Sequence, residues 1–118
     1  LLILFVFGIV ALGRREERAR KLEARRFADK YYPNHSKFVT RVASVLSKLI
    51  GVSPRRFSPS SRLLEDLRMD EAIEWFDLTE VVEQEFHIDL ESEEGTEVIT
   101  VDDLIRLLGR LANSPIGK

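Results

Sequence analysis

Histidines and carboxylates are the side chains of this sequence that could bind a metal or transfer protons. The two histidines, His35 and His87, lie far apart, and neither has a second ligand at the spacing of a metal site. The run from Asp89 begins like a calcium-binding loop, but its sixth residue is Glu94 and its twelfth is Thr100, where such a loop needs glycine and glutamate. We therefore expect two surface histidines, a solvated acidic loop and no metal.

Acid–base catalysis also lacks a recognisable site in the sequence. Carboxylates crowd between Glu65 and Glu85, but no motif beside them indicates a pocket or a raised carboxyl pKa. There is no glycine-rich phosphate loop, and the chain contains no cysteine. We predict that the chain is not an enzyme and that it holds no cofactor.

Charge divides the chain into two parts. Residues 1–37 contain nine Lys or Arg against four Asp or Glu, whereas residues 38–118 contain nine against sixteen. All sixteen of those acids lie between Glu65 and Asp103, where the only base is Arg68. A basic neck therefore precedes an acidic body, and nucleic acid is excluded as a partner of the body because its phosphates would be repelled.

The start of the chain, LLILFVFGIVALG, is apolar and is followed by Arg14 and Arg15. Twelve helical residues span only about 18 Å, and a bilayer core needs about 20 residues, so we expect residues 1–13 to be the second half of a transmembrane helix. A signal-peptide core would have its positive charge in front, and a buried helix of so small a domain would not be apolar all round. The arginines after this segment predict a single-pass membrane protein with its C-terminal domain in the cytoplasm.

Residues 14–35 form the basic neck, which has strong helix formers and no proline before Pro33. We expect a juxtamembrane helix or linker that continues the apolar helix. Two interpretations remain open, a solvated charged helix and a contact with anionic lipid headgroups. The candidate headgroup contacts are Arg14, Arg15, Arg18 and Lys21.

The body begins after Pro33 with an amphipathic segment from Phe38 to Ile50, which Ser36 can cap and Gly51 ends. A long loop, VSPRRFSPSSRLLEDL, follows it. Such a loop is acceptable in a small domain only if its apolar side chains dock. The predicted core residues of the loop are Phe57, Leu63, Leu64 and Leu67.

Two further helices are indicated by apolar spacing. The first runs from about Glu71 to Phe86 and places Trp75, Leu78, Val82 and Phe86 on one stripe, with Val81 beside it. The second begins at the capping box Thr100-Val101-Asp102-Asp103. Its inward positions are Val101, Leu104, Ile105, Leu108 and Leu111. The chain is therefore predicted to be all-α, with a four-helix domain over residues 36–113.

Short motifs follow one another in a definite order across residues 38–111. They are Ile50-Gly51-Val52, Phe57, Glu65-Asp66-Leu67, Glu83-Gln84-Glu85-Phe86, Ile88-Asp89-Leu90 and Thr100-Val101-Asp102-Asp103. Their order and spacing resemble those of an acyl carrier protein. The resemblance implies a small helical bundle in which a serine, at the start of the second helix, is esterified to phosphopantetheine. It also implies that this acidic helix meets basic patches on partner proteins.

The serine of that resemblance is missing. Counting forward from Asp66 places it at Glu71, and counting back from Phe86 places it at Ala72, because one extra residue separates the two landmarks. Neither side chain is a nucleophile. Three serines in the preceding loop, Ser58, Ser60 and Ser61, read more simply as turn residues. The chain therefore resembles the serine-less relatives of working carriers.

Trp75 and Phe76 are adjacent in the predicted helix, so both cannot point inward well. Both could fill the core, or at least one could face a partner within an acidic rim. The candidate docking residues are Glu71, Glu74, Trp75, Phe76, Asp77 and Glu80. We expect a membrane-anchored accessory or scaffolding subunit of a larger membrane complex. The alternatives are a carrier modified at an atypical site or binding acyl chains non-covalently, and a membrane-surface regulator.

Overall fold

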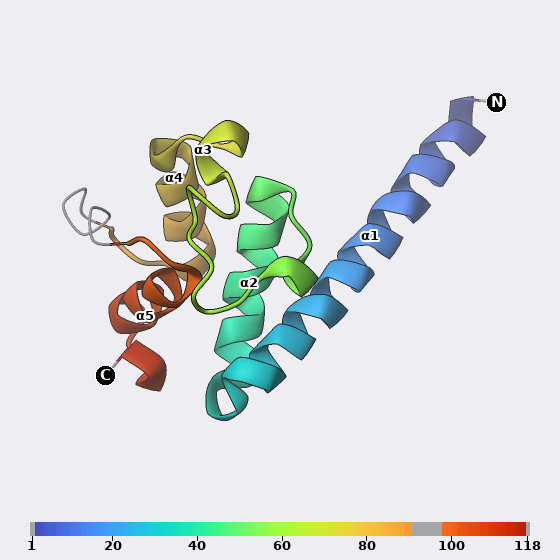
Figure 1. Ribbon diagram of the computed structural model, residues 1–118. Coiled ribbons are helices and arrows are strands. Elements are labelled where there is room, and N and C mark those ends of the chain that lie inside the picture. The colour runs from blue at the N-terminus through green and yellow to red at the C-terminus, as the bar shows by residue number, and fades with distance from the viewer. Residues whose placement is uncertain (1, 91–97, 118) are drawn as a thin grey trace.

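The computed structural model describes residues 2–90 and 98–117, and its regular elements over these ranges are helices (Figure 1). The α-helices are α1 (Leu2–Tyr31), α2 (Ser36–Ile50), α3 (Met69–Ala72), α4 (Trp75–Phe86) and α5 (Val101–Leu111). Short 3-10 turns are η1 (Pro33–His35), η2 (Pro54–Arg56) and η4 (Pro115–Gly117). The all-α prediction is confirmed for the described residues. Among them, Arg62 and Thr100 form an isolated antiparallel bridge that is not part of a strand.

The predicted transmembrane helix is wrong. Among the described residues, no helix combines the length and the apolar character that crossing a membrane requires. α1 is long, at 30 residues, but charged turns follow its apolar first part from Arg14 onward. A window of membrane-spanning length therefore includes several charges, each of which is costly in hydrocarbon. The single-pass membrane localisation is wrong for the same reason, and the cytoplasmic orientation depended on it.

The basic neck is helical and continuous with the apolar start, as expected, but one of its faces lies in the core. Ala24, Phe27 and Ala28 are buried, and the ring of Phe27 meets that of Phe57 edge-on at 6.2 Å between centroids. The Tyr32 hydroxyl donates to Asp102 Oδ1 over 2.5 Å. The neck therefore packs on the bundle as a fifth element of the core and is not solvated on all sides.

α2 follows the predicted amphipathic pattern. Its apolar stripe of Val39, Val42, Leu46 and Ile50 is buried, and Gly51 ends the helix at a φ of 71°. This left-handed conformation suits glycine because it has no Cβ. Ser36 is the first helical residue, and its hydroxyl donates to Asp29 of α1 instead of capping α2.

The predicted helix from Glu71 to Phe86 is two helices. α3 ends at Ala72, and Ile73 and Glu74 are extended, with ψ values of 143° and 148°, before α4 begins. Met69 and Leu78 are both buried, although nine positions of an unbroken helix would place them on opposite sides. The break therefore rotates α4 so that both helices face one core.

α5 begins at the predicted capping box. Thr100 Oγ1 accepts from the Asp103 N–H at 3.1 Å, and Asp103 Oδ2 accepts from the Thr100 N–H at 3.0 Å. The predicted inward residues Val101, Leu104, Ile105 and Leu108 are buried, Leu111 is half-buried, and the sequence reasoning missed buried Leu107.

The long loop contributes Phe57, Leu63 and Leu67 to the core, as predicted, but Leu64 is 56% exposed. The Leu63 N–H donates to the Ile99 carbonyl at 2.9 Å next to the Arg62–Thr100 bridge. Leu63 is thereby held against the core, whereas Leu64 lies on the outside of the turn that the Asp66 and Leu67 N–H groups close onto the Arg62 carbonyl. The expectation that Leu64 is a core residue is therefore wrong.

Candidate functional site

The position of the missing serine lies at the end of the long loop and in α3. Arg68 precedes α3 with a φ of 53°, and Glu71 and Ala72 are exposed on the short helix. The whole stretch from Arg62 to Leu78 contains no serine, threonine, tyrosine or cysteine. No hydroxyl or thiol of this stretch can therefore be esterified.

A shallow pocket of about 330 Å³ lies beside this position, and the sequence reasoning did not foresee it. Its lining combines apolar side chains with charged ones from the loop and α3. The lining residues are Ile50, Val52, Arg56, Asp66, Leu67, Arg68, Glu71 and Ala72. The volume is at the small end of the range of ligand pockets. The wall includes Leu67 and residues next to Gly51, but their positions in the sequence do not indicate that they enclose a space.

Asp66, a carboxylate that lines this pocket, is a poor proton donor. The Arg62 N–H donates to Asp66 Oδ2 at 2.8 Å, and the Arg62 guanidinium lies 3.3 Å from Asp66 Oδ1. The backbone hydrogen bond is the larger influence, and both contacts hold the pKa of Asp66 below its ordinary value. A general acid at neutral pH needs the opposite shift.

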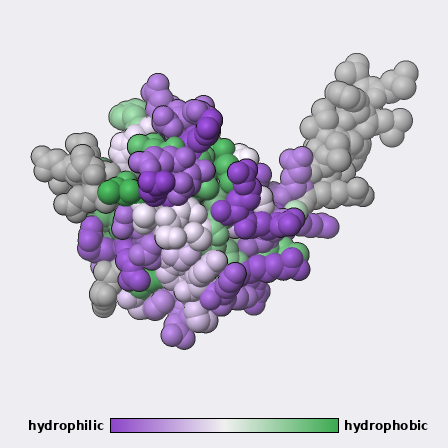
Figure 2. Space-filling view, viewed as in Figure 1, coloured by the Kyte–Doolittle hydropathy of each residue, from purple (hydrophilic) through white to green (hydrophobic). Residues whose placement is uncertain are grey.

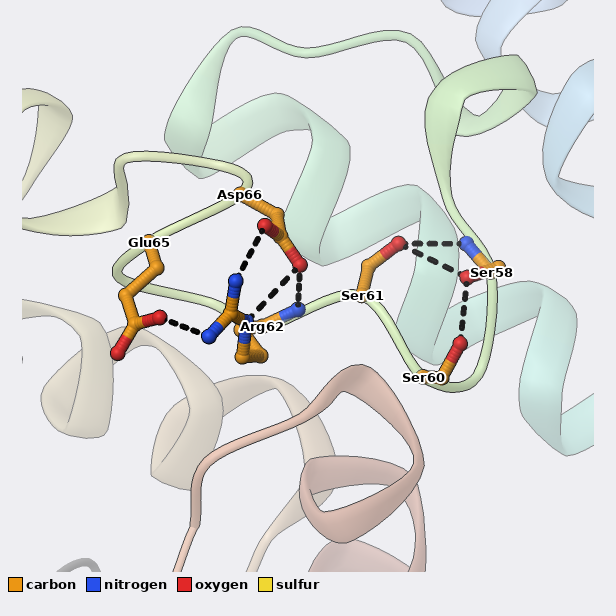
Figure 3. A network of polar contacts seen from close by, with 6 residues as sticks. All are labelled: Ser58, Ser60, Ser61, Arg62, Glu65 and Asp66. Carbon is orange, nitrogen blue, oxygen red and sulfur yellow. Dashed lines mark hydrogen bonds and ion pairs between the residues drawn. The ribbon is translucent and has the colours of Figure 1, made fainter.

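The three loop serines are occupied with one another (Figure 3). The Ser58 N–H donates to Ser61 Oγ at 2.9 Å, and the Ser58 hydroxyl lies 3.0 Å from Ser61 Oγ and 3.2 Å from Ser60 Oγ. The Asp102 N–H donates to the Pro59 carbonyl at 3.0 Å, which fastens the same turn to α5. These contacts fit the interpretation of the serines as turn residues.

The outer face of α4 carries an exposed aromatic ring among acidic residues. Phe76 is 69% exposed and Val81 is 38% exposed, whereas Trp75 is half-buried against the core. Glu71, Glu74, Asp77 and Glu80 are all exposed. Figure 2 shows hydrophilic residues gathered over α3 and α4 with hydrophobic surface between them. One aromatic thus faces outward, while its binding to a partner stays a prediction.

The remaining candidate residues are more scattered. Arg18 and Lys21 are exposed on α1, and Arg14 and Arg15 lie in the same helix, so their contact with lipid headgroups stays a prediction. Within the described residues, no group of three His, Cys, Asp or Glu side chains could hold a metal ion. Most of the acidic loop after Leu90 lies outside the described residues.

Sequence comparison relates this chain distantly to a known protein. No model of a known protein family matches the chain. A segment of 71 residues, which is 60% of this chain and 92% of the relative, is 27% identical to a protein of Phaeodactylum tricornutum. That relative is an acyl carrier protein. The distant similarity supports an acyl-carrier-like domain.

Proposed function

We propose that the chain is a non-enzymatic, acyl-carrier-like interaction module that serves as an accessory or scaffolding subunit of a larger protein complex. Its docking surface is the exposed side of α3 and α4, formed by Glu71, Glu74, Trp75, Phe76, Asp77 and Glu80. The observation that carries the proposal is the 69% exposure of Phe76 within this acidic surface. The partner surface is accordingly basic, with apolar side chains that can cover Phe76.

The missing hydroxyl supports an interaction role over a carrier role. Phosphopantetheine attachment requires a serine oxygen to attack phosphorus, and the sequence from Arg62 to Leu78 has no hydroxyl. Glu71 would in addition place a negative charge beside a phosphate. The scaffold can persist without its original chemistry because function depends on the site and not on the fold.

The energetics of the surface support a docking role for Phe76. Burial of an exposed phenylalanine ring against a partner contributes about 2 kcal/mol, so Phe76 can act as an apolar anchor of the docking surface. The acidic side chains around it favour fast association with a basic partner and contribute less to affinity. A central aromatic residue with a charged rim is the usual anatomy of an energetic hot spot.

The proposal is tested by comparing Phe76→Ala with Leu64→Ala. Leu64 is a matched control because it is also a large exposed apolar residue, at 56%, but lies in the loop outside the docking surface. The complex is first isolated by mild extraction from the source cells, native electrophoresis and mass spectrometry. We expect Phe76→Ala to weaken retention of the co-purifying subunit about tenfold or more and Leu64→Ala to change it less than about twofold.

Equal retention by both variants, with folding verified by circular dichroism, would contradict the proposed surface. A chain that migrates alone at its sequence mass under all mild conditions would contradict the subunit role as a whole. Retention lost in Phe76→Ala and weakened by salt would support both the aromatic anchor and the acidic rim.

The similarity to an acyl carrier protein and the pocket beside Glu71 favour a second candidate function. In this alternative the chain carries an acyl or phosphopantetheine group at an atypical position, or holds an acyl chain non-covalently. The intact mass of the native protein separates the two functions. A mass above the sequence mass by a phosphopantetheine group, or lipid released on denaturation, would support the alternative and contradict a purely structural role.

A further inference from the structure

The charged neck carries a second exposed apolar anchor, on the outer side of α1. Leu22 is 53% exposed. Arg18, Arg25 and Arg26 lie four positions before it and three and four positions after it, so all three surround Leu22 on one helix face. We call Arg18, Leu22, Arg25 and Arg26 the basic face.

The basic face is turned away from the core. From Glu16 to the end of α1 the buried residues are Ala24, Phe27 and Ala28, and the three arginines are exposed. Arg25 lies 3.8 Å from Asp29, but both side chains are more than half exposed, so this pair contributes little. Neither Arg18 nor Arg26 forms an ion pair within the described part of the chain. Their charges are available to another molecule.

The outer side of α4 has the complementary construction. Phe76 and Val81 supply exposed apolar surface, and Asp77 and Glu80 supply negative charge beside them. Phe76 and Glu80, like Asp77 and Val81, are four positions apart and therefore neighbours on the helix surface. We call these four residues the acidic face. Neither acid forms an ion pair within the described residues.

One copy of the chain cannot bring its two faces together. α2 lies between α1 and α4, so the faces are on different sides of the molecule (Figure 1). A helix with its side chains is about 10 Å thick, which exceeds the Debye length of about 8 Å at physiological salt. Charge neutralisation within one copy is therefore weak, and each face keeps its charge and its apolar centre.

We infer that the basic face of one copy docks on the acidic face of a second copy, with Leu22 packing near Phe76 and the arginines around Asp77 and Glu80. The inference rests on the proposed function, because it assigns a partner to part of the same docking surface. The contact is heterologous, so each added copy leaves one free face of each kind. One helix face against another buries little area, so the dissociation constant is expected to be about micromolar or weaker.

The experiment uses the full chain and two charge-reversed variants in sedimentation velocity over a range of concentrations. The first variant is Arg18→Glu with Arg26→Glu, and the second is Asp77→Lys with Glu80→Lys. We expect each variant alone to associate at least about tenfold more weakly than the unaltered chain, because equal charges then meet. An equimolar mixture of the two variants should recover association, because each offers the face that the other needs. Lys48→Glu, at an exposed cation of α2, is the control and should change nothing.

The outcomes separate this inference from its alternatives. If association survives both charge reversals, the inference is overturned. Contact through the apolar residues 2–13 would give this result. A chain that stays monomeric at every concentration and at low salt overturns it as well. Reversals that abolish association without recovery in the mixture also count against the proposed pairing. The proposed function is judged independently, by retention of a different subunit in the Phe76→Ala and Leu64→Ala comparison.

Discussion

The contact between Tyr32, which directly follows α1, and α5 is a specific one, whereas the side formed by α3 and α4 presents exposed apolar and charged groups. The Tyr32 hydroxyl binds Asp102, and Asp102 Oδ2 accepts from Arg106 Nε at 2.8 Å. On the α3–α4 side Arg68 has a left-handed backbone, and Phe76 is exposed. The ion pair there, Arg68 with Glu71 at 3.5 Å, is largely solvated.

This difference shows how a small bundle can keep a surface free for a partner. Groups that satisfy one another inside the molecule stabilise the fold but offer nothing to another protein. Exposed apolar and charged groups stabilise the fold little, and their interaction energy is realised only on binding. The bundle therefore depends for stability on the packing of α1 and on the Tyr32–Asp102 contact, and its α3–α4 side is where a partner is proposed.

The largest expected effect tests whether α1 belongs to the folding unit. Phe27 is 4% exposed and contacts Phe57, so Phe27→Ala should lower the free energy of unfolding by about 3–5 kcal/mol. Urea unfolding followed by circular dichroism measures the change. Leu22→Ala, on the exposed side of the same helix, is the control. A loss below about 1 kcal/mol for Phe27→Ala would mean that α1 is a mere appendage and would weaken the comparison.

A smaller effect is expected for Tyr32→Phe, which removes the hydroxyl that binds Asp102. The expected loss is about 1–2 kcal/mol, because hydrogen bonds to charged groups exceed neutral ones. Burial, and secondarily Asp102, raise the pKa of Tyr32 above its ordinary value. The neutral form is thus favoured in the fold, so this stability is present below about pH 10 and falls as the pH rises toward the folded pKa. The variant should show a flatter alkaline decline in urea unfolding, and an unchanged decline would contradict this assignment.

The next prediction addresses the backbone of the α3–α4 side. Arg68→Gly should raise the free energy of unfolding by about 0.5–1 kcal/mol, because a φ of 53° costs energy for residues with a Cβ. Glu71→Gly is the control, since Glu71 is in ordinary right-handed helix and the change should cost about 1 kcal/mol. Differential scanning calorimetry of both variants measures the contrast. A loss of stability in Arg68→Gly would show that its side chain matters more than its backbone.

The smallest expected effect concerns acid stability at the start of α5. The Thr100 N–H, and to a lesser extent the Ile99 N–H, hold the pKa of Asp103 below its ordinary value. A lowered folded pKa means that this contribution is present above about pH 4 and is lost as the pH falls through the folded pKa. Asp103→Asn should therefore be slightly destabilising at pH 7 and should decline less below about pH 4 in acid titrations of stability. Parallel curves for both proteins would contradict a role for this cap.

Regular periodicity made part of this fold predictable from sequence. α2 and α5 were predicted nearly to the residue, because a glycine or a capping box defines their ends and an apolar stripe defines their inner faces. The break at Ile73 was not predictable, because no proline or glycine marks it. Leu64 could not be distinguished from Leu63 by residue type, and only the hydrogen bond of Leu63 to Ile99 decides that Leu63 is buried while Leu64 is exposed.

The apolar first part of α1 led to the wrong prediction of a membrane-spanning helix. Among the described residues no helix is both long and apolar enough to cross a membrane, because charged turns begin at Arg14. The pocket beside Glu71 was missed because its wall joins the end of α2, the loop and α3. Sequence spacing gives positions along one element and does not show which elements enclose a space.

The sequence by itself determined that no hydroxyl lies between Arg62 and Leu78, that the body is helical, and that the neck and the body carry opposite charge. These properties belong to residue types and local periodicity, which need no tertiary contact to be recognised. Only the tertiary structure decided that Phe27 enters the core while Leu22 stays outside, and that Trp75 packs inward while Phe76 is exposed. The physical reason is that a side chain is buried by the elements packed around it, and their placement depends on contacts between residues distant in sequence.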